Sequence, residues 1–214
     1  MHPIASLLTI LGALALGCIS PGPSFLFVTR TAVAVSRPAG LSAAAGMGLG
    51  ASLISALALL GVRAVLSEAQ WLYIGFKLLG GGYLCYLGWR LWRGSRQSTA
   101  VAPVEAVPQP PASLVRSFWL ALATQLSNPK TLLVIGGIFA ALLPEHVPLW
   151  MYFTIPVIQL FMEGSWYAFV AIAMSSTGPR SVYLRARGRI DRAAGCVLGA
   201  LGLRLIYEGT TEAV

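Results

Sequence analysis

Two short proline-containing stretches lie where the hydropathy of the chain otherwise predicts uninterrupted helices. The first is Pro21-Gly22-Pro23 and the second is Asn128-Pro129-Lys130. Each proline removes a backbone N–H donor and costs roughly 3 kcal/mol in a helix interior, so both helices must break. In hydrocarbon, the polar backbone groups that a break sets free must be satisfied by protein or water. We therefore predict that both breaks face the interior of the molecule.

The first break can offer a ligand its backbone. Gly22 leaves room for a close approach, and the helix that starts after Pro23 points the positive end of its dipole at the gap. A carboxylate would be stabilised there. The alternative is a proline kink that serves packing only. Because a break occurs in each half of the chain, the pair favours a binding site for substrate.

The second break carries groups that can bind charge. Lys130 falls near the centre of an apolar run, where an unpaired cation costs at least about 2.5 to 3.5 kcal/mol. We expect it to face a cavity or a partner. Asn128 has both a donor and an acceptor, and can bind an ammonium, a carboxylate or freed backbone groups. Alternatively, the stretch only caps and restarts a helix, with Lys130 paired to Glu163.

Glu163, in the stretch LFMEGSWYAF, is the only acidic residue well inside an apolar run. Removal from water favours the neutral form of a carboxyl group, which makes Glu163 a candidate proton carrier or counter-charge for a substrate ammonium. The alternative is a structural ion pair with Lys130 or Lys77. Lys77 lies within snorkelling reach of the membrane interface and is a further candidate for charge coupling.

The composition places these residues in a lipid bilayer. The chain has 214 residues, of which 57% are hydrophobic and 10% charged, whereas a soluble domain has about 25% charged residues. It is therefore predicted to be an integral membrane protein. The net charge of +8 does not indicate nucleic acid as a partner, because the basic residues lie in short segments between apolar runs. The two histidines and three cysteines have no metal-binding spacing, and no cofactor is expected.

Six apolar runs approach the ~20 residues that cross a bilayer, so the predicted fold class is all-α with six transmembrane helices. The N-terminal run lacks a basic region and a cleavage site, and is expected to be retained as a span. The predicted spans are Ile4–Val35, Ala39–Leu66, Gln70–Trp92, Leu114–Leu143, Pro148–Ser175 and Arg192–Tyr207.

Residues 93–113 are rich in proline and small polar residues and predict a flexible linker. They separate a first three-helix unit, residues 1–92, from a second, residues 114–214. Most arginines flank the linker side of the spans, whereas Arg63 stands with several glutamates on the other side. By the positive-inside rule, the linker is cytoplasmic and both termini lie outside the inner membrane.

The two units resemble each other. The stretches GGYLCYLGWRLW and GCVLGALGLRLI share the ending Gly-x-Arg-Leu, and ISPGPSFL corresponds to LSNPKTLL around the two breaks. Units with an odd number of spans must have opposite orientations, which predicts two inverted three-helix repeats with helices 1 and 4 broken. Glycines 46, 48 and 50 and glycines 80 to 82 predict small-residue faces, for helix packing, for sliding or for a homodimer interface.

Taken together, the two breaks, the stretch SRPAGLSAAAGMGLG and the stretch FKLLGGGYLCYLGWRL resemble the lysine exporter (LysE/RhtB) family of amino-acid exporters. The resemblance covers nearly the whole chain except the linker. It implies six transmembrane helices and export of amino acids or related metabolites, driven by an ion gradient that we expect to be of protons. Ser36 stands where a glycine of the family is expected.

We therefore expect a secondary transporter that exports amino acids by proton antiport. Its substrate would bind between the two breaks, while Glu163 and Lys130 handle charge. An enzyme is not expected, because no nucleophile and base, paired acids or histidine cluster is present. A membrane scaffold or assembly subunit is an alternative, although ionisable groups in mid-membrane would then have no role. An uptake carrier is another, since a sequence indicates a pathway and not a direction.

Overall fold

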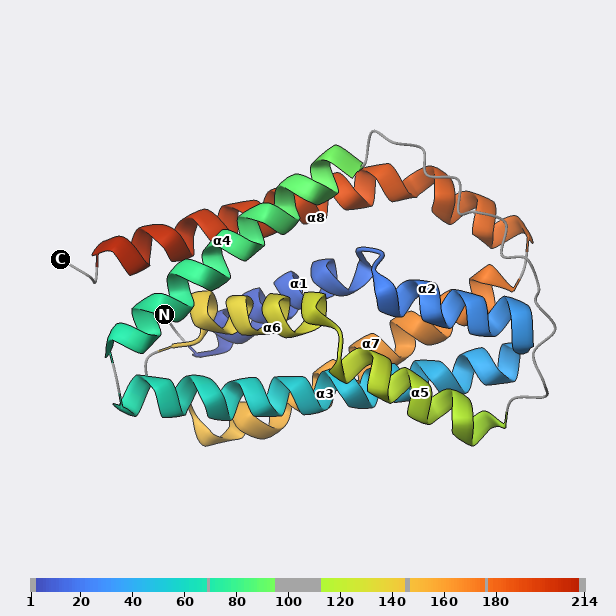
Figure 1. Ribbon diagram of the computed structural model, residues 1–214, viewed down its shortest axis with the longest axis horizontal. Coiled ribbons are helices and arrows are strands. Elements are labelled where there is room, and N and C mark those ends of the chain that lie inside the picture. The colour runs from blue at the N-terminus through green and yellow to red at the C-terminus, as the bar shows by residue number, and fades with distance from the viewer. Residues whose placement is uncertain (1–2, 69, 95–112, 145–146, 176, 212–214) are drawn as a thin grey trace.

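The computed structural model describes residues 3–68, 70–94, 113–144, 147–175 and 177–211, and every regular element in these ranges is a helix. Figure 1 shows the helices lying along the long axis, with the start of α1 and the end of α8 at the same end of the molecule. The elements are α1 (Pro3–Ile19), α2 (Pro23–Arg30), the π-helix η1 (Thr31–Val35), α3 (Arg37–Glu68), α4 (Gln70–Gly94), α5 (Leu114–Leu126), α6 (Pro129–Leu142), α7 (Leu149–Met174) and α8 (Thr177–Thr211).

Both predicted breaks are present. The first separates α1 from α2, and the two parts of this run are bent by 55°. The second separates α5 from α6 at Ser127 and Asn128. In each case the chain resumes its helix with a proline, Pro23 or Pro129, at the first helical position. A proline is tolerated there because the N–H of that position has no helical partner in any case.

The predicted set of six spans is supported in part. Among the described residues, Arg37–Gly61 and Leu149–Met174 are each long and apolar enough to cross a membrane, and the bent pair Pro3–Ile19 with Pro23–Val35 makes a third candidate. Helix α6 is apolar but has only 14 residues. The described part of the chain is thus all-helical, and the chain is a multi-pass membrane protein.

The last helix is much longer than its apolar part. The predicted span Arg192–Tyr207 lies inside α8, which begins at Thr177 and has 35 residues. Arginine is a good helix former, so the basic segment continues the helix although it lowers the hydropathy. The linker prediction concerns mainly residues outside the described ranges: α4 continues to Gly94, and the description resumes at Ser113.

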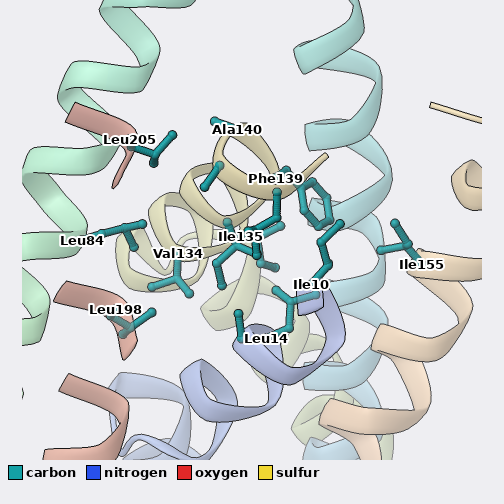
Figure 2. Packing of buried hydrophobic residues seen from close by; sticks show 14 of the residues in the cluster. Ile10, Leu14, Leu84, Val134, Ile135, Phe139, Ala140, Ile155, Leu198 and Leu205 are labelled. Atoms are coloured by element: carbon teal, nitrogen blue, oxygen red, sulfur yellow. The ribbon is translucent and has the colours of Figure 1, made fainter. Parts of the chain in front are cut away.

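Helix α6 forms the centre of the larger apolar cluster. All nine residues from Val134 to Leu142 are buried, which explains why the helix is apolar on every side. Figure 2 shows side chains from α1, α4, α7 and α8 converging on it. The labelled residues of these four helices are Ile10, Leu14, Leu84, Ile155, Leu198 and Leu205. The second break is therefore attached to a helix that the core holds in place.

Helices α4 and α8 contact each other through glycines. A Cβ atom on Gly81 would lie 2.8 Å from the carbonyl oxygen of Gly202, and one on Gly88 would lie 2.6 Å from that of Gly195. Only residues without a side chain allow such an approach of two backbones. Gly195 lies 114 positions after Gly81, and Gly202 lies 114 positions after Gly88. Each glycine of α4 therefore contacts the counterpart of the other one, so the two contacts are reciprocal.

The centre of this crossing joins two equivalent residues. The Sγ atom of Cys85 lies 3.7 Å from the carbonyl oxygen of Gly199, and these residues are themselves 114 positions apart. Two segments related by a two-fold axis make such contacts: a residue near the axis meets its own counterpart, and the contacts on either side of it are reciprocal. The glycines of α3 also pack closely: Gly46 contacts α5, and Gly48 contacts α7.

Candidate functional site

Lys130 reaches from the second break to the first. Its Nζ donates hydrogen bonds to the carbonyl oxygens of Ser20 at 2.5 Å and Gly17 at 3.3 Å. The carbonyl of Gly17 lacks its helical partner because the residue four positions later is Pro21, which has no N–H. The side chain of Lys130 passes over Gly22, where a Cβ atom would come within 3.1 Å of Lys130 Cδ. A lysine of one half thus satisfies carbonyl groups freed in the other.

Asn128 joins the two breaks a second time. Its Oδ1 accepts a hydrogen bond from the backbone N–H of Lys130 at 3.0 Å and so caps α6. Its Nδ2 donates to Ser24 Oγ, in the first turn of α2, at 2.8 Å. The corresponding cap of α2 is Gly22, which has no side chain to contribute. One asparagine therefore serves the starts of both helices.

A chain of buried side chains continues from Asn128 to Glu163. Ser24 Oγ donates to Gln125 Oε1 at 2.5 Å, and Gln125 Nε2 donates to Glu163 Oε2 at 2.6 Å. Gln159 Nε2 donates to the other carboxylate oxygen at 3.1 Å. All of these residues are buried, with at most 5% of their surface exposed to solvent. Two N–H donors compensate an ionised carboxylate for part of its lost hydration.

Amides, and not a contact ion pair with a lysine, hold the carboxylate of Glu163. In the described part of the chain, no ion pair joins Glu163 to Lys130 or to Lys77. Lys77 is buried in α4, and its Nζ lies 3.8 Å from the carboxylate of Glu208 in α8. Glu208 also accepts a hydrogen bond from Arg204 at 2.7 Å. Lys77 is therefore part of a separate charged cluster.

Two cavities meet at the breaks. The larger, of about 470 Å³, has the size of a small-molecule site, whereas the smaller, of about 20 Å³, has room for about one water molecule. Glu163 lines the smaller cavity, and the last turns of α4 line the larger. Three residues line both: Gly22, Asn128 and Lys130. They form the partition between the two spaces.

The predicted binding residues come together. Pro21, Gly22, Pro23, Asn128, Pro129 and Lys130 all line the larger cavity. Lys77 lines neither of the two cavities at the breaks. Among the described residues, no group of three or more histidine, cysteine, aspartate or glutamate side chains could hold a metal ion. Amides, hydroxyls and carbonyl groups surround Glu163 and Lys130 at the breaks, and Asp191, Arg90 and Arg93 also line the larger cavity.

Four residues of the site were not predicted. Asp191 is 4% exposed and lines the larger cavity, but in the sequence it stands among arginines that indicate topology. Ser24, Gln125 and Gln159 are ordinary polar residues whose partners lie on other helices. One signal was available: Gln159 precedes Glu163 by four positions, which places both on one face of a helix.

Comparison with known proteins gives a consistent result. The profile of the family described as LysE type translocator matches residues 15–209. The threonine efflux protein of Escherichia coli (strain K12) is 31% identical over 196 residues, covering 89% of this chain and 92% of that protein. An uncharacterized membrane protein of the same organism, YahN, is 30% identical over 99% of this chain and 94% of that protein.

A leucine efflux protein of Salmonella choleraesuis (strain SC-B67) is 30% identical over 128 residues, covering 60% of this chain and 58% of that protein. No solved structure matches the chain. Two of these relatives are named for efflux, of threonine and of leucine, and the name of the third states only a membrane protein.

Proposed function

The chain belongs to the LysE type translocator family, and from this premise we propose that it exports a neutral amino acid, or a related metabolite, by proton antiport across the inner membrane. The family resemblance read from the sequence is thereby confirmed. The chain is a membrane transporter and not an enzyme. The substrate, the coupling ion and the path through the molecule are the proposed parts.

The partition at the two breaks is the observation that carries this proposal. The larger cavity can hold an amino acid, and the smaller one contains a buried acid. A transporter of this kind binds its substrate where broken helices meet and exposes that site to each side in turn. Movement of Lys130 and the two helix starts would join the cavities, which is the step that alternating access requires.

Neutral substrates are favoured by the charges of the site. The relatives named above are a threonine and a leucine efflux protein. At the smaller cavity, Glu163 is the one described acidic residue in the lining, and a dibasic substrate would bring a second cation that needs a second carboxylate there. Asp191, which lines the larger cavity, could hold an ammonium on the way in.

Glu163 is the proposed proton carrier. Each of its carboxylate oxygens accepts a hydrogen bond from an amide, and a glutamine amide can turn to offer its oxygen to a protonated carboxyl group instead. The site can thus hold Glu163 in either protonation state without an ion pair. Lys77, held beside Glu208 between α4 and α8, is a second candidate for charge coupling.

We further propose that the chain crosses the membrane six times, as two inverted three-helix repeats. The reciprocal glycine contacts between α4 and α8 and the equivalent breaks in α1–α2 and α5–α6 support this arrangement. With the linker on the cytoplasmic side and both termini outside, the larger cavity would open to the cytoplasm, because the last turn of α4 lines it.

Counterflow in proteoliposomes tests the proposal. Vesicles loaded with threonine, leucine, lysine or glutamate are diluted into the labelled amino acid, with and without an imposed proton gradient. We expect wild type to exchange threonine or leucine, and Glu163→Gln to keep exchange while losing gradient-driven accumulation, because exchange moves no net proton. If folded wild type exchanges none of the four, the function is wrong. If Glu163→Gln accumulates substrate as wild type does, its proton role is wrong.

A further inference from the structure

We propose that the carbonyl oxygens of Gly17 and Ser20 form the subsite for the ammonium group of the substrate, and that Lys130 occupies this subsite until the substrate displaces it. This inference rests on the proposed function and names one part of its binding site. It changes the role of Lys130 from a substrate contact to an internal competitor.

The carbonyl groups are suited to an ammonium. Gly17 lies in the last turn of α1, and Ser20 directly follows this helix. Pro21 and the end of the helix remove the usual N–H partners of their carbonyl groups. The end of α1 also carries the negative pole of its helix dipole. In a site away from water such acceptors must be satisfied, and a group with several N–H donors can satisfy both at once.

Lys130 presents the chemical group that a substrate would bring. The lysine side chain ends in a primary ammonium with three donors, and the α-ammonium of an amino acid is the same group. Two of the donors are used, on the oxygens of Ser20 and Gly17. A free amino acid that places its ammonium here would replace both hydrogen bonds one for one.

The surroundings allow Lys130 to leave. Its stem lies over Gly22, which has no side chain to trap it, and lysine has a flexible four-carbon stem. Lys130 already lines the larger cavity, as does Asp191. A displaced ammonium would enter a cavity of about 470 Å³ whose lining includes this acidic residue together with Arg90 and Arg93.

Displacement would also open the partition. Lys130 is one of the three residues that separate the two cavities, and the other two, Gly22 and Asn128, are small by comparison. Binding of the substrate ammonium would remove the longest of these side chains from the boundary. Arrival of the substrate would then be linked to access toward Glu163.

The competing explanation is that Lys130 binds the substrate directly, for example through its carboxylate. The two explanations predict opposite effects of removing the ammonium. A tethered competitor reduces the apparent affinity in proportion to the fraction of time that it occupies the site, so its removal strengthens binding. A direct contact, when removed, weakens binding.

Binding of threonine and leucine, and of their N-acetyl derivatives, to purified protein in nanodiscs tests the inference. The proteins are wild type, Lys130→Met and, as a control, Arg116→Met, which removes an exposed cation of α5 that lines neither cavity at the breaks. We expect Lys130→Met to bind an amino acid at least fivefold more tightly than wild type, with no gain for the N-acetyl derivative. Arg116→Met should bind both as wild type does. Weaker or unchanged binding by folded Lys130→Met overturns the inference.

A second variant keeps the test open if Lys130→Met does not fold. In Lys130→Ala, added methylammonium should fill the vacant subsite and compete with the amino acid, whereas it should have no effect on wild type. Absence of this competition contradicts the subsite. Wild type that binds no amino acid and fails in counterflow contradicts the proposed function itself, so the two failures are distinguishable.

Discussion

The two helix breaks, one in each half of the chain, contribute different groups. The first, Pro21-Gly22-Pro23, offers backbone: freed carbonyls at the end of α1 and a helix start whose cap has no side chain. The second offers side chains: Asn128 caps its own helix, and both Asn128 and Lys130 reach the other break. Side chains of the second break thus satisfy groups of the first, so the halves are joined where the substrate is proposed to bind.

In the proposed inverted repeat, this difference gives a reason why the sequence need not be symmetric at the site. At the α4–α8 crossing, Gly81 and Gly88 match Gly195 and Gly202, because close packing of two backbones requires residues without side chains. At the breaks, donors must face acceptors, and two identical breaks would present like groups to each other. The comparison predicts that matched substitutions in the two breaks have unequal effects.

The largest effect is expected at the cap of α6. Asn128→Ala removes the hydrogen bond to the N–H of Lys130 and the one to Ser24, which leaves buried groups without partners. We expect a loss of about 2 to 4 kcal/mol in the free energy of unfolding, from one helix cap and one buried hydrogen bond. Counterflow of threonine or leucine should fall to background. Denaturant or thermal unfolding in detergent measures the first effect.

Gly22→Ala, at the corresponding cap of α2, is the matched control. The backbone of Gly22 is extended, with φ −145° and ψ −164°, a conformation that alanine adopts freely. The three atoms nearest to the new Cβ would all belong to the flexible side chain of Lys130. We expect a change below about 1 kcal/mol, within the range of mild substitutions. Equal losses for Asn128→Ala and Gly22→Ala would contradict the division between side-chain and backbone contributions.

A smaller difference should separate the two glutamines that hold Glu163. Gln125 binds both Glu163 and Ser24, whereas Gln159 binds Glu163 alone among the described residues. We expect Gln125→Leu to reduce the free energy of unfolding by about 1 to 3 kcal/mol and Gln159→Leu to reduce it by less. The same unfolding assay compares them. If Gln159→Leu reduces the free energy of unfolding more than Gln125→Leu does, the hydrogen-bonded side chains from Asn128 to Glu163 do not connect the breaks to the acid.

Much of the fold could be predicted from the sequence, because it depends on local rules. The apolar runs indicate α3 and α7 to within two residues of their observed ends, and the prolines mark both breaks. The start of α8 was not predicted, since arginines reduce hydropathy without ending a helix. Apolar character locates the part of a helix that can lie in lipid, and only a capping signal locates its end.

The sequence indicated some residues that meet at the breaks, but it missed Asp191, and it missed Ser24, Gln125 and Gln159 with the hydrogen bonds that connect them. Spacing brought the two breaks and Glu163 together as candidates, whereas the partner of Lys130 depends on where a long side chain reaches across two halves of the molecule. Charge alone suggested the ion pair of Lys130 and Glu163, but carbonyl groups at the first break and amides around the acid satisfy each one separately. Such choices depend on distances between helices that the sequence does not state.

Accessibility of Cys18 tests the central claim, the partition at the breaks, most directly. Cys18 lines the smaller cavity, and Arg93→Cys would place a reference thiol on the larger one. Both are measured after Cys85→Ser and Cys196→Ser, with a charged methanethiosulfonate reagent added to the cytoplasmic face of inside-out vesicles.

We predict that the thiol at position 93 reacts rapidly with or without substrate. Cys18 should react at least tenfold more slowly without amino acid, and several-fold faster once threonine or leucine is added at saturation. Equal rates at the two positions in the absence of amino acid would show that no partition separates the cavities, and would contradict the account.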